Sequence, residues 1–187
     1  MADHKNPTKP SRRSIRLKEF DYSQSGLYFV TIMTHQRKCL FGEIVDGKVQ
    51  LIEAGTIVSE MWVGVQERFP TVSADLFVVM PNHAHGIITI GAQYNAPDGA
   101  GGKGAMNRAP TLGQVIRTLK AASTHRIRQS IDLGIVWQRN YYEHVIRDEQ
   151  SLQRIRQYIC DNPLRWELDP ENPDATLPES SDPWRVP

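Results

Sequence analysis

The sequence has 187 residues, of which 22 are Lys or Arg and 21 are Asp or Glu, so the formal net charge is +1 at pH 7. This length suits one domain, and a hydrophobic share of 40% with a balanced charge excludes a disordered chain, a uniformly basic nucleic-acid coat and an acidic tail protein. Two cysteines, no apolar run near the ~20 residues of a membrane span and no apolar stretch at the N-terminus lead us to expect a soluble protein of the reducing cytoplasm.

Charge is nevertheless divided along the chain. Residues 1–19 form a basic N-terminal arm, and residues 168–187 form an acidic, Pro-rich tail. Residues 103–130 contain no acidic side chain, and their basic side chains are Lys103, Arg108, Arg117, Lys120, Arg126 and Arg128. Such a segment either binds a polyanion or forms a solvated helix face, and charge alone slightly favours the solvated face.

The first half of the chain predicts strands with one helix among them. Residues 27–34 are rich in β-branched and aromatic residues, which indicates a strand, and Asp46-Gly47 marks a short hairpin. Apolar positions recur with a helical period over residues 53–68. Two strands follow, over 74–79 and 84–90, and their short connection implies antiparallel pairing.

The second half predicts two helices. Residues 91–110 are rich in Gly and Ala and predict a flexible loop. Thr111 is a suitable N-cap for a helix that reaches about residue 129, and Asp148 caps a last helix that ends at Pro163. The order of strands and helices favours an α+β fold, a small antiparallel sheet with helices packed on it.

Two histidines in a short motif, His83-Ala84-His85, are the first candidate for chemistry. Residues i and i+2 of a strand point to the same face, so the two imidazoles are half of a divalent-metal site. Gly86 follows, and we expect its missing side chain to let a ligand or backbone approach closely. Two surface histidines on a strand remain the alternative for so short a motif.

Several hydrolase classes are excluded by the residues around this motif. Ile87 stands where a histidine-triad hydrolase needs a third His and where a two-histidine phosphoesterase needs Ser or Thr. The sequence also lacks the Cys-x-x-Cys of a zinc deaminase and the His-Glu-x-x-His of a zincin.

The last predicted helix carries the second candidate. Tyr158 and Asn162 are four residues apart and share one helical face. An amide oxygen is a suitable ligand for Mg²⁺ or Mn²⁺, and a tyrosine beside a metal suits transesterification at a phosphodiester through a covalent phosphotyrosine. A packed Tyr and a C-terminal Asn cap are the simpler alternative when this helix is considered alone.

Three ordered segments resemble a known family. Residues 79–88 look like the His-hydrophobic-His segment of single-tyrosine HUH transposases, with the small Ala84 at the hydrophobic position. Residues 137–147 resemble the block typical of the REP-associated tyrosine transposase branch, and residues 158–163 follow it at the expected distance. The resemblance spans roughly residues 15–167.

This resemblance implies a ferredoxin-like domain over residues 20–167 that cleaves and rejoins single-stranded or hairpin DNA with Mg²⁺ or Mn²⁺. It also implies that His83, His85 and Asn162 bind the metal and that Tyr158 is the nucleophile, which leaves a 5′-phosphotyrosine and a free 3′-OH. A homodimer is compatible with the resemblance. The alternative is a non-catalytic DNA-binding protein or repressor that keeps the fold, and a metal-dependent hydrolase ranks third.

The same family context changes the interpretation of the basic and aromatic side chains. The cations expected at DNA phosphates are Arg117, Lys120, Arg126 and Arg128. Tyr142 and His144 are candidates to line the DNA path, whereas we expect Tyr141 to pack against the sheet. Trp137 could stack on a base, but a core tryptophan is the favoured interpretation.

Overall fold

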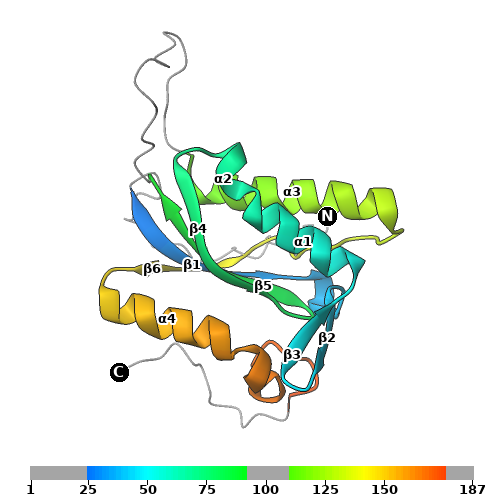
Figure 1. Cartoon of the computed structure of the whole chain (residues 1–187). Helices are drawn as coiled ribbons and strands as arrows, with labels where there is room; N and C mark the ends of the chain where they lie inside the picture. Colours follow the sequence, from blue (N-terminus) through cyan, green and yellow to red (C-terminus); the bar gives the residue numbers. More distant parts are fainter. Residues whose placement is uncertain (1–24, 92–109, 176–187) are drawn as a thin grey trace, which may run out of the picture.

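A computed structural model describes residues 25–91 and 110–175 of the chain (Figure 1). Its strands are β1 (Gly26–Met33), β2 (Gly42–Val45), β3 (Lys48–Leu51), β4 (Val72–Val79), β5 (His83–Ile90) and β6 (Tyr142–Ile146). Its α-helices are α1 (Glu53–Val63), α2 (Val65–Arg68), α3 (Leu112–Ser130) and α4 (Glu149–Asp161), and its 3-10 helices are η1 (His35–Arg37) and η2 (Pro163–Leu168).

Four strands form the main sheet, in the order β4-β5-β1-β6, and every neighbouring pair is antiparallel. Together with α1 and α3, these strands follow one another as βαββαβ, which is the ferredoxin-like arrangement. Strands β2 and β3 form a separate hairpin. The predicted α+β fold is therefore confirmed.

Helices cover both faces of the sheet (Figure 1). Alternate residues of a strand point to opposite faces, so β1 directs Tyr28, Val30 and Ile32 into the core beneath α1 and α3. Phe29 points the other way and packs with Ile87 in a smaller cluster under α4. The two candidate motifs lie on this second face, between the sheet and α4.

Most of the predicted elements are present, with differences at their ends. The helix predicted over residues 53–68 is interrupted at Gly64, so it becomes α1 and α2. Thr111 caps α3 through a capping box with Gln114, and Asp148 caps α4 by accepting from the Ser151 N–H. The short segment between α3 and α4 contains β6, which the sequence did not predict as a definite strand.

Some predictions concern parts of the chain outside the described residues. These parts are the basic arm, almost all of the Gly-rich segment 91–110 and the tail beyond residue 175. Within the described part, no helix combines the length and the apolar character that crossing a membrane requires.

Candidate active site

Strand β5 directs both histidines of the motif toward α4. His83 and His85 are buried, and their ring centroids lie 4.3 Å apart. Ala84 and Gly86 point to the opposite face. The expectation that Gly86 admits a ligand or backbone is wrong, because the space beside its Cα is filled by the Trp62 indole of α1. The missing side chain of Gly86 therefore makes room for Trp62 in the core and not for a ligand at the site.

The tautomer of His83 is fixed by its neighbour Asn82. The Asn82 amide Nδ2 donates to the backbone oxygens of Arg37 at 3.1 Å and Glu171 at 2.7 Å. Asn82 Oδ1 therefore faces His83 Nδ1 as an acceptor, at 2.8 Å. His83 Nδ1 carries the proton, and Nε2 keeps a lone pair. This Nε2 is buried and has no hydrogen-bond partner in the described part of the chain.

Burial keeps both imidazoles neutral. It lowers the pKa of His83 to about 4, against the opposing effects of Asp169 and Asn162. Burial, followed by the proximity of His83, also lowers the pKa of His85 well below its ordinary value. His85 Nδ1 lies 2.9 Å from the Thr31 hydroxyl on β1, and its ring stacks on Phe29. Both rings are therefore held in place and uncharged near neutral pH, as metal ligands must be.

Helix α4 brings Tyr158 to the same place. Its hydroxyl lies 3.3 Å from His85 Nε2, and its ring packs edge-on against Phe29 and His85. The Tyr158 side chain is half-buried. Burial, and then the charges of Asp169 and Glu171, raise the pKa of its phenol. The hydroxyl is protonated at neutral pH, so it needs a nearby positive charge before it can act as a nucleophile.

Asn162, the C-cap of α4, is buried beside the histidines. Its Nδ2 donates to Asp169 Oδ2 at 2.6 Å, while its Oδ1 is a buried acceptor without a hydrogen-bond partner among the described residues. The chain therefore holds two buried acceptors, His83 Nε2 and Asn162 Oδ1, whose lone pairs are not used within the described protein. Such acceptors are costly to bury unless a cation or a donor satisfies them.

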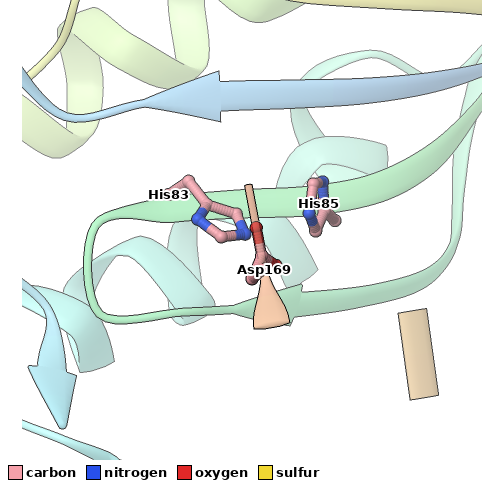
Figure 2. Close-up of side chains that lie close together, drawn as sticks. All are labelled: His83, His85 and Asp169. Carbon is pink, nitrogen blue, oxygen red and sulfur yellow. The ribbon is translucent and has the colours of Figure 1, made fainter. Parts of the chain in front are cut away.

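Asp169 is a site residue that the sequence analysis missed. It is buried, and it offers a carboxylate oxygen within 4.8 Å of ligand nitrogens of His83 and His85. Figure 2 shows this carboxylate beside the two imidazoles. By sequence Asp169 belongs to the acidic tail, and no spacing rule separates it from Glu167, Glu171 or Asp174 nearby.

The chain after α4 folds back onto the site. After helix η2 the chain reaches Asn82, directly before β5, and Asn82 Nδ2 donates to the Glu171 oxygen. Arg37 holds this segment by donating to the Pro170 oxygen at 3.2 Å and by lying 3.0 Å from the Glu171 carboxylate. The Glu171 N–H donates to Asp169 Oδ1 at 2.7 Å and fixes that carboxylate.

These donors fit a divalent cation. Two imidazoles with unprotonated nitrogens, one amide oxygen and one carboxylate oxygen form a nitrogen and oxygen set without sulfur. The amide and carboxylate oxygens are ligands that Mg²⁺ and Mn²⁺ prefer, and imidazole nitrogens are ligands of first-row transition ions, to which Mn²⁺ belongs. The fit rests on the two unsatisfied acceptors and on the buried Asp169 carboxylate beside the histidines.

The remaining predicted residues divide between the two faces of the sheet. Tyr142, on β6, pairs with Thr31 and belongs to the cluster on the Tyr158 face, and His144 is exposed further along the same strand. Arg117, Lys120 and Arg128 line a groove beside α3, on the other face. Arg126 points away from this groove and forms an ion pair with Glu60 at 2.6 Å.

Trp137 is a core residue, as the sequence favoured. Its side chain is buried, its indole N–H donates to the Ser123 hydroxyl at 3.0 Å, and its ring packs on Phe41. Tyr141 is partly buried against the same core, in agreement with its predicted packing role.

Comparison with known proteins identifies a close relative and a structural neighbour. No family model matches the sequence. An uncharacterized protein of Haemophilus influenzae is 42% identical over 164 residues, which cover 84% of this chain and 91% of that protein. A REP-associated tyrosine transposase bound to a REP hairpin superposes with a TM-score of 0.53 at 21% identity, over 84% of this chain and 74% of the transposase. The chain therefore belongs to the family of the Haemophilus influenzae protein, and its fold is that of a REP-associated tyrosine transposase.

Proposed function

We propose that this protein is a metal-dependent DNA strand transferase that cleaves and rejoins single-stranded DNA through a covalent bond to Tyr158. The main observation behind the proposal is the position of the Tyr158 hydroxyl, 3.3 Å from His85 Nε2 and next to a buried set of metal-type donors. A protein that only binds DNA has no need for this combination. The transposase-like fold supports the same assignment.

The metal ligands in this proposal are His83, His85 and Asn162, the three residues predicted from sequence, together with Asp169. A bound Mg²⁺ or Mn²⁺ supplies positive charge that polarises the scissile phosphate and stabilises an ionised phenol. Asn82 keeps the lone pair of His83 directed into the site, and Thr31 orients the ring of His85. These contacts prepare the ligands before DNA binds.

The reaction is a transesterification at phosphorus. The Tyr158 oxygen forms a bond to the phosphorus, and the bond from phosphorus to the 3′ oxygen breaks. The phenolic proton passes to water, and the departing 3′ oxygen takes up a proton from water. The products are a 5′-phosphotyrosine and a free 3′-OH, and the reverse attack by a 3′-OH rejoins the strand. No net hydrolysis takes place, so the phosphodiester energy is conserved.

The proposed partner is single-stranded DNA or a hairpin with single-stranded flanks, because the active-site tyrosine has to reach an unpaired phosphodiester. The structural neighbour was solved with a REP hairpin, which supports this choice. A cytoplasmic location and the possibility of a homodimer stay predictions from the sequence.

Tyr158→Phe tests the mechanism, because it removes one oxygen and almost no volume. We expect it to abolish the covalent adduct while folding, metal binding and DNA binding persist. The wild-type protein is incubated with Mn²⁺ and hairpin DNA from beside its own gene, and an SDS-stable adduct is located by mass spectrometry. Tyr142→Phe is the matched control on the same face of the sheet, and we expect it to retain the adduct.

Two outcomes would contradict the proposal. An adduct on Tyr142, or normal adduct formation by Tyr158→Phe, would move the nucleophile elsewhere. Tight DNA binding by the wild-type protein without any adduct, across a range of Mg²⁺ and Mn²⁺ concentrations, would support the non-catalytic repressor instead.

A further inference from the structure

A groove runs between α3 and residues 135–141, on the face of the sheet opposite Tyr158. Its volume is about 480 Å³, within the range of small-ligand sites. Its lining includes Arg117, Lys120, Arg128, Ile135, Arg139 and Tyr141. Figure 1 shows α3 on the far side of the sheet from α4.

The floor of this groove is apolar. Ile116, Val136 and Trp137 contribute side chains that are almost fully buried, whereas Ile135, at the rim, is 62% exposed. Tyr141 adds an aromatic ring at the end next to β6. The three floor side chains close the bottom of the groove, and the apolar surface open to a flat group comes from Ile135 and the partly buried Tyr141 ring.

Every charged side chain that the described part of the chain places at the groove is basic. Arg117 and Arg139 are exposed, and the ion pairs between described residues involve other arginines. Arg128 donates to the Gly134 oxygen at 3.0 Å, which ties the end of α3 to the other wall. None of the described residues that line the groove is acidic, so an anion there meets no carboxylate from residues 25–91 or 110–175.

Lys120 joins the two sides of the groove by hydrogen bonds, so its ammonium group is not a free cation. Its Nζ donates to the backbone oxygens of Gln138 and Asn140, each at 2.8 Å. Burial lowers its pKa to about 8. Lys120 thereby anchors residues 138–141 against α3 and holds Tyr141 and Arg139 in position.

We propose that this groove binds one unpaired nucleotide of the DNA strand, an inference that rests on the proposed function. The base lies against Ile135 and Tyr141, and its flanking phosphates lie against Arg117 and Arg139. An aromatic ring with unpaired cations and no acid is the pattern by which proteins hold single strands. A purely anionic ligand, such as an acidic peptide, would leave the exposed Ile135 and the Tyr141 ring without an apolar partner.

The topology connects this groove to the reaction. Tyr141 and Tyr142 are successive residues on β6 and the approach to it, so they point to opposite faces of the sheet. In the described chain β6 is the last strand of the sheet, next to β1 alone. A DNA strand held beside Tyr141 reaches Tyr142 and then Tyr158 by passing around the edge at β6.

The test measures binding without chemistry. The probe is fluorescein-labelled oligothymidylate of about 15 nucleotides, a length in the range of single-strand sites, and Tyr158→Phe protein with EDTA prevents cleavage. We expect Arg117→Ala combined with Arg139→Ala to weaken binding about tenfold or more. The slope of log affinity against log salt should fall by about 1.4, because about 0.7 is lost for each single-strand phosphate contact.

The matched control is Arg126→Ala, on the same helix but paired with Glu60 outside the groove, and we expect it to bind like the parent protein. A second measurement uses 5-iodouracil in place of one thymine, with irradiation and peptide mapping. We expect the cross-link at Tyr141 or in the adjacent residues 135–140. Polyglutamate at equal charge concentration should not displace the DNA.

The outcomes separate this inference from the proposed function. If the groove variants bind DNA like Arg126→Ala and the cross-link maps elsewhere, the groove assignment is overturned, whether or not wild-type protein forms its adduct. Displacement by polyglutamate would also overturn it, because the site would then be a general anion site. If the groove variants lose binding while wild-type protein forms no adduct, only the proposed chemistry fails.

Discussion

Asn82 controls which nitrogen of His83 faces the proposed metal site, although the Asn82 side chain is not itself a proposed ligand. Its amide is held by two backbone oxygens, so the oxygen of the side chain has a fixed direction. An imidazole whose Nδ1–H is held by such an acceptor presents an unprotonated Nε2. The structure thereby makes Asn82 a positioning residue for the proposed cation.

We expect Asn82→Ala to lower the affinity for Mn²⁺ by about 10-fold to 100-fold, the usual cost of losing a partner that orients a ligand. Isothermal titration calorimetry measures the affinity, and ¹⁵N NMR of the His83 imidazole reports whether Nδ1 stays protonated. Asn82→Asp keeps an acceptor for His83 and should retain more affinity than Asn82→Ala. The same affinity in Asn82→Ala and wild-type protein would show that another contact fixes this ring.

Strand β5 serves a different purpose on each of its faces. His83 and His85 point to the site, while Ala84 and Gly86 point to the core. The Trp62 ring fills the space beside Gly86 and stacks on Phe77, with centroids 5.5 Å apart. The site strand is therefore held in place by the packing of α1 on the other side of the sheet.

Gly86→Ala should destabilise the protein by about 1–3 kcal/mol, because the added methyl group would overlap the Trp62 ring. Urea unfolding followed by tryptophan fluorescence measures the change in the free energy of unfolding. Gly134→Ala is the matched control, since a methyl group there meets no atom within 4 Å, and its stability should be unchanged or slightly higher. A fully stable Gly86→Ala protein would contradict the described packing of Trp62.

At the scale of the whole molecule, two neutral histidines buried together couple folding to pH. The pKa of His83 falls from 6.5 to about 4 on burial, so between these values the unfolded chain binds a proton that the folded chain does not. Stability rises with pH wherever the unfolded state binds more protons. The metal-free protein should therefore lose stability as pH falls below about 6.5, and the contribution of His83 should level off near pH 4.

The expected slope is up to about 1.4 kcal/mol per pH unit for each such histidine. Urea unfolding in EDTA at a series of pH values between 7 and 4 measures it. His83→Gln cannot titrate and should show a smaller slope over this window, which separates the histidine from carboxylates that titrate lower. Identical slopes for His83→Gln and wild-type protein would show that His83 is not buried in the neutral form.

The local parts of the fold and of the site could be predicted from the sequence. Most of the strands and helices, both helix caps and the turn between β4 and β5 follow from residue periodicity and from capping side chains. The same periodicities place His83 and His85 on one face of a strand and Tyr158 and Asn162 on one face of a helix. These relations depend only on backbone geometry, so a few neighbouring residues determine them.

The tertiary structure alone decided which of these faces meet and what else joins them. Asp169 lies among acidic residues that look alike in the sequence, and it reaches the histidines because η2 and Arg37 return the chain to β5. The sequence likewise predicts a single role, contact with DNA phosphates, for the basic residues of α3. In the structure Arg126 forms an ion pair with Glu60, Lys120 donates to two backbone oxygens and Arg117 lines an open groove. Each of these outcomes depends on contacts between distant elements, whose relative placement is set by packing across the whole core and not by any local pattern.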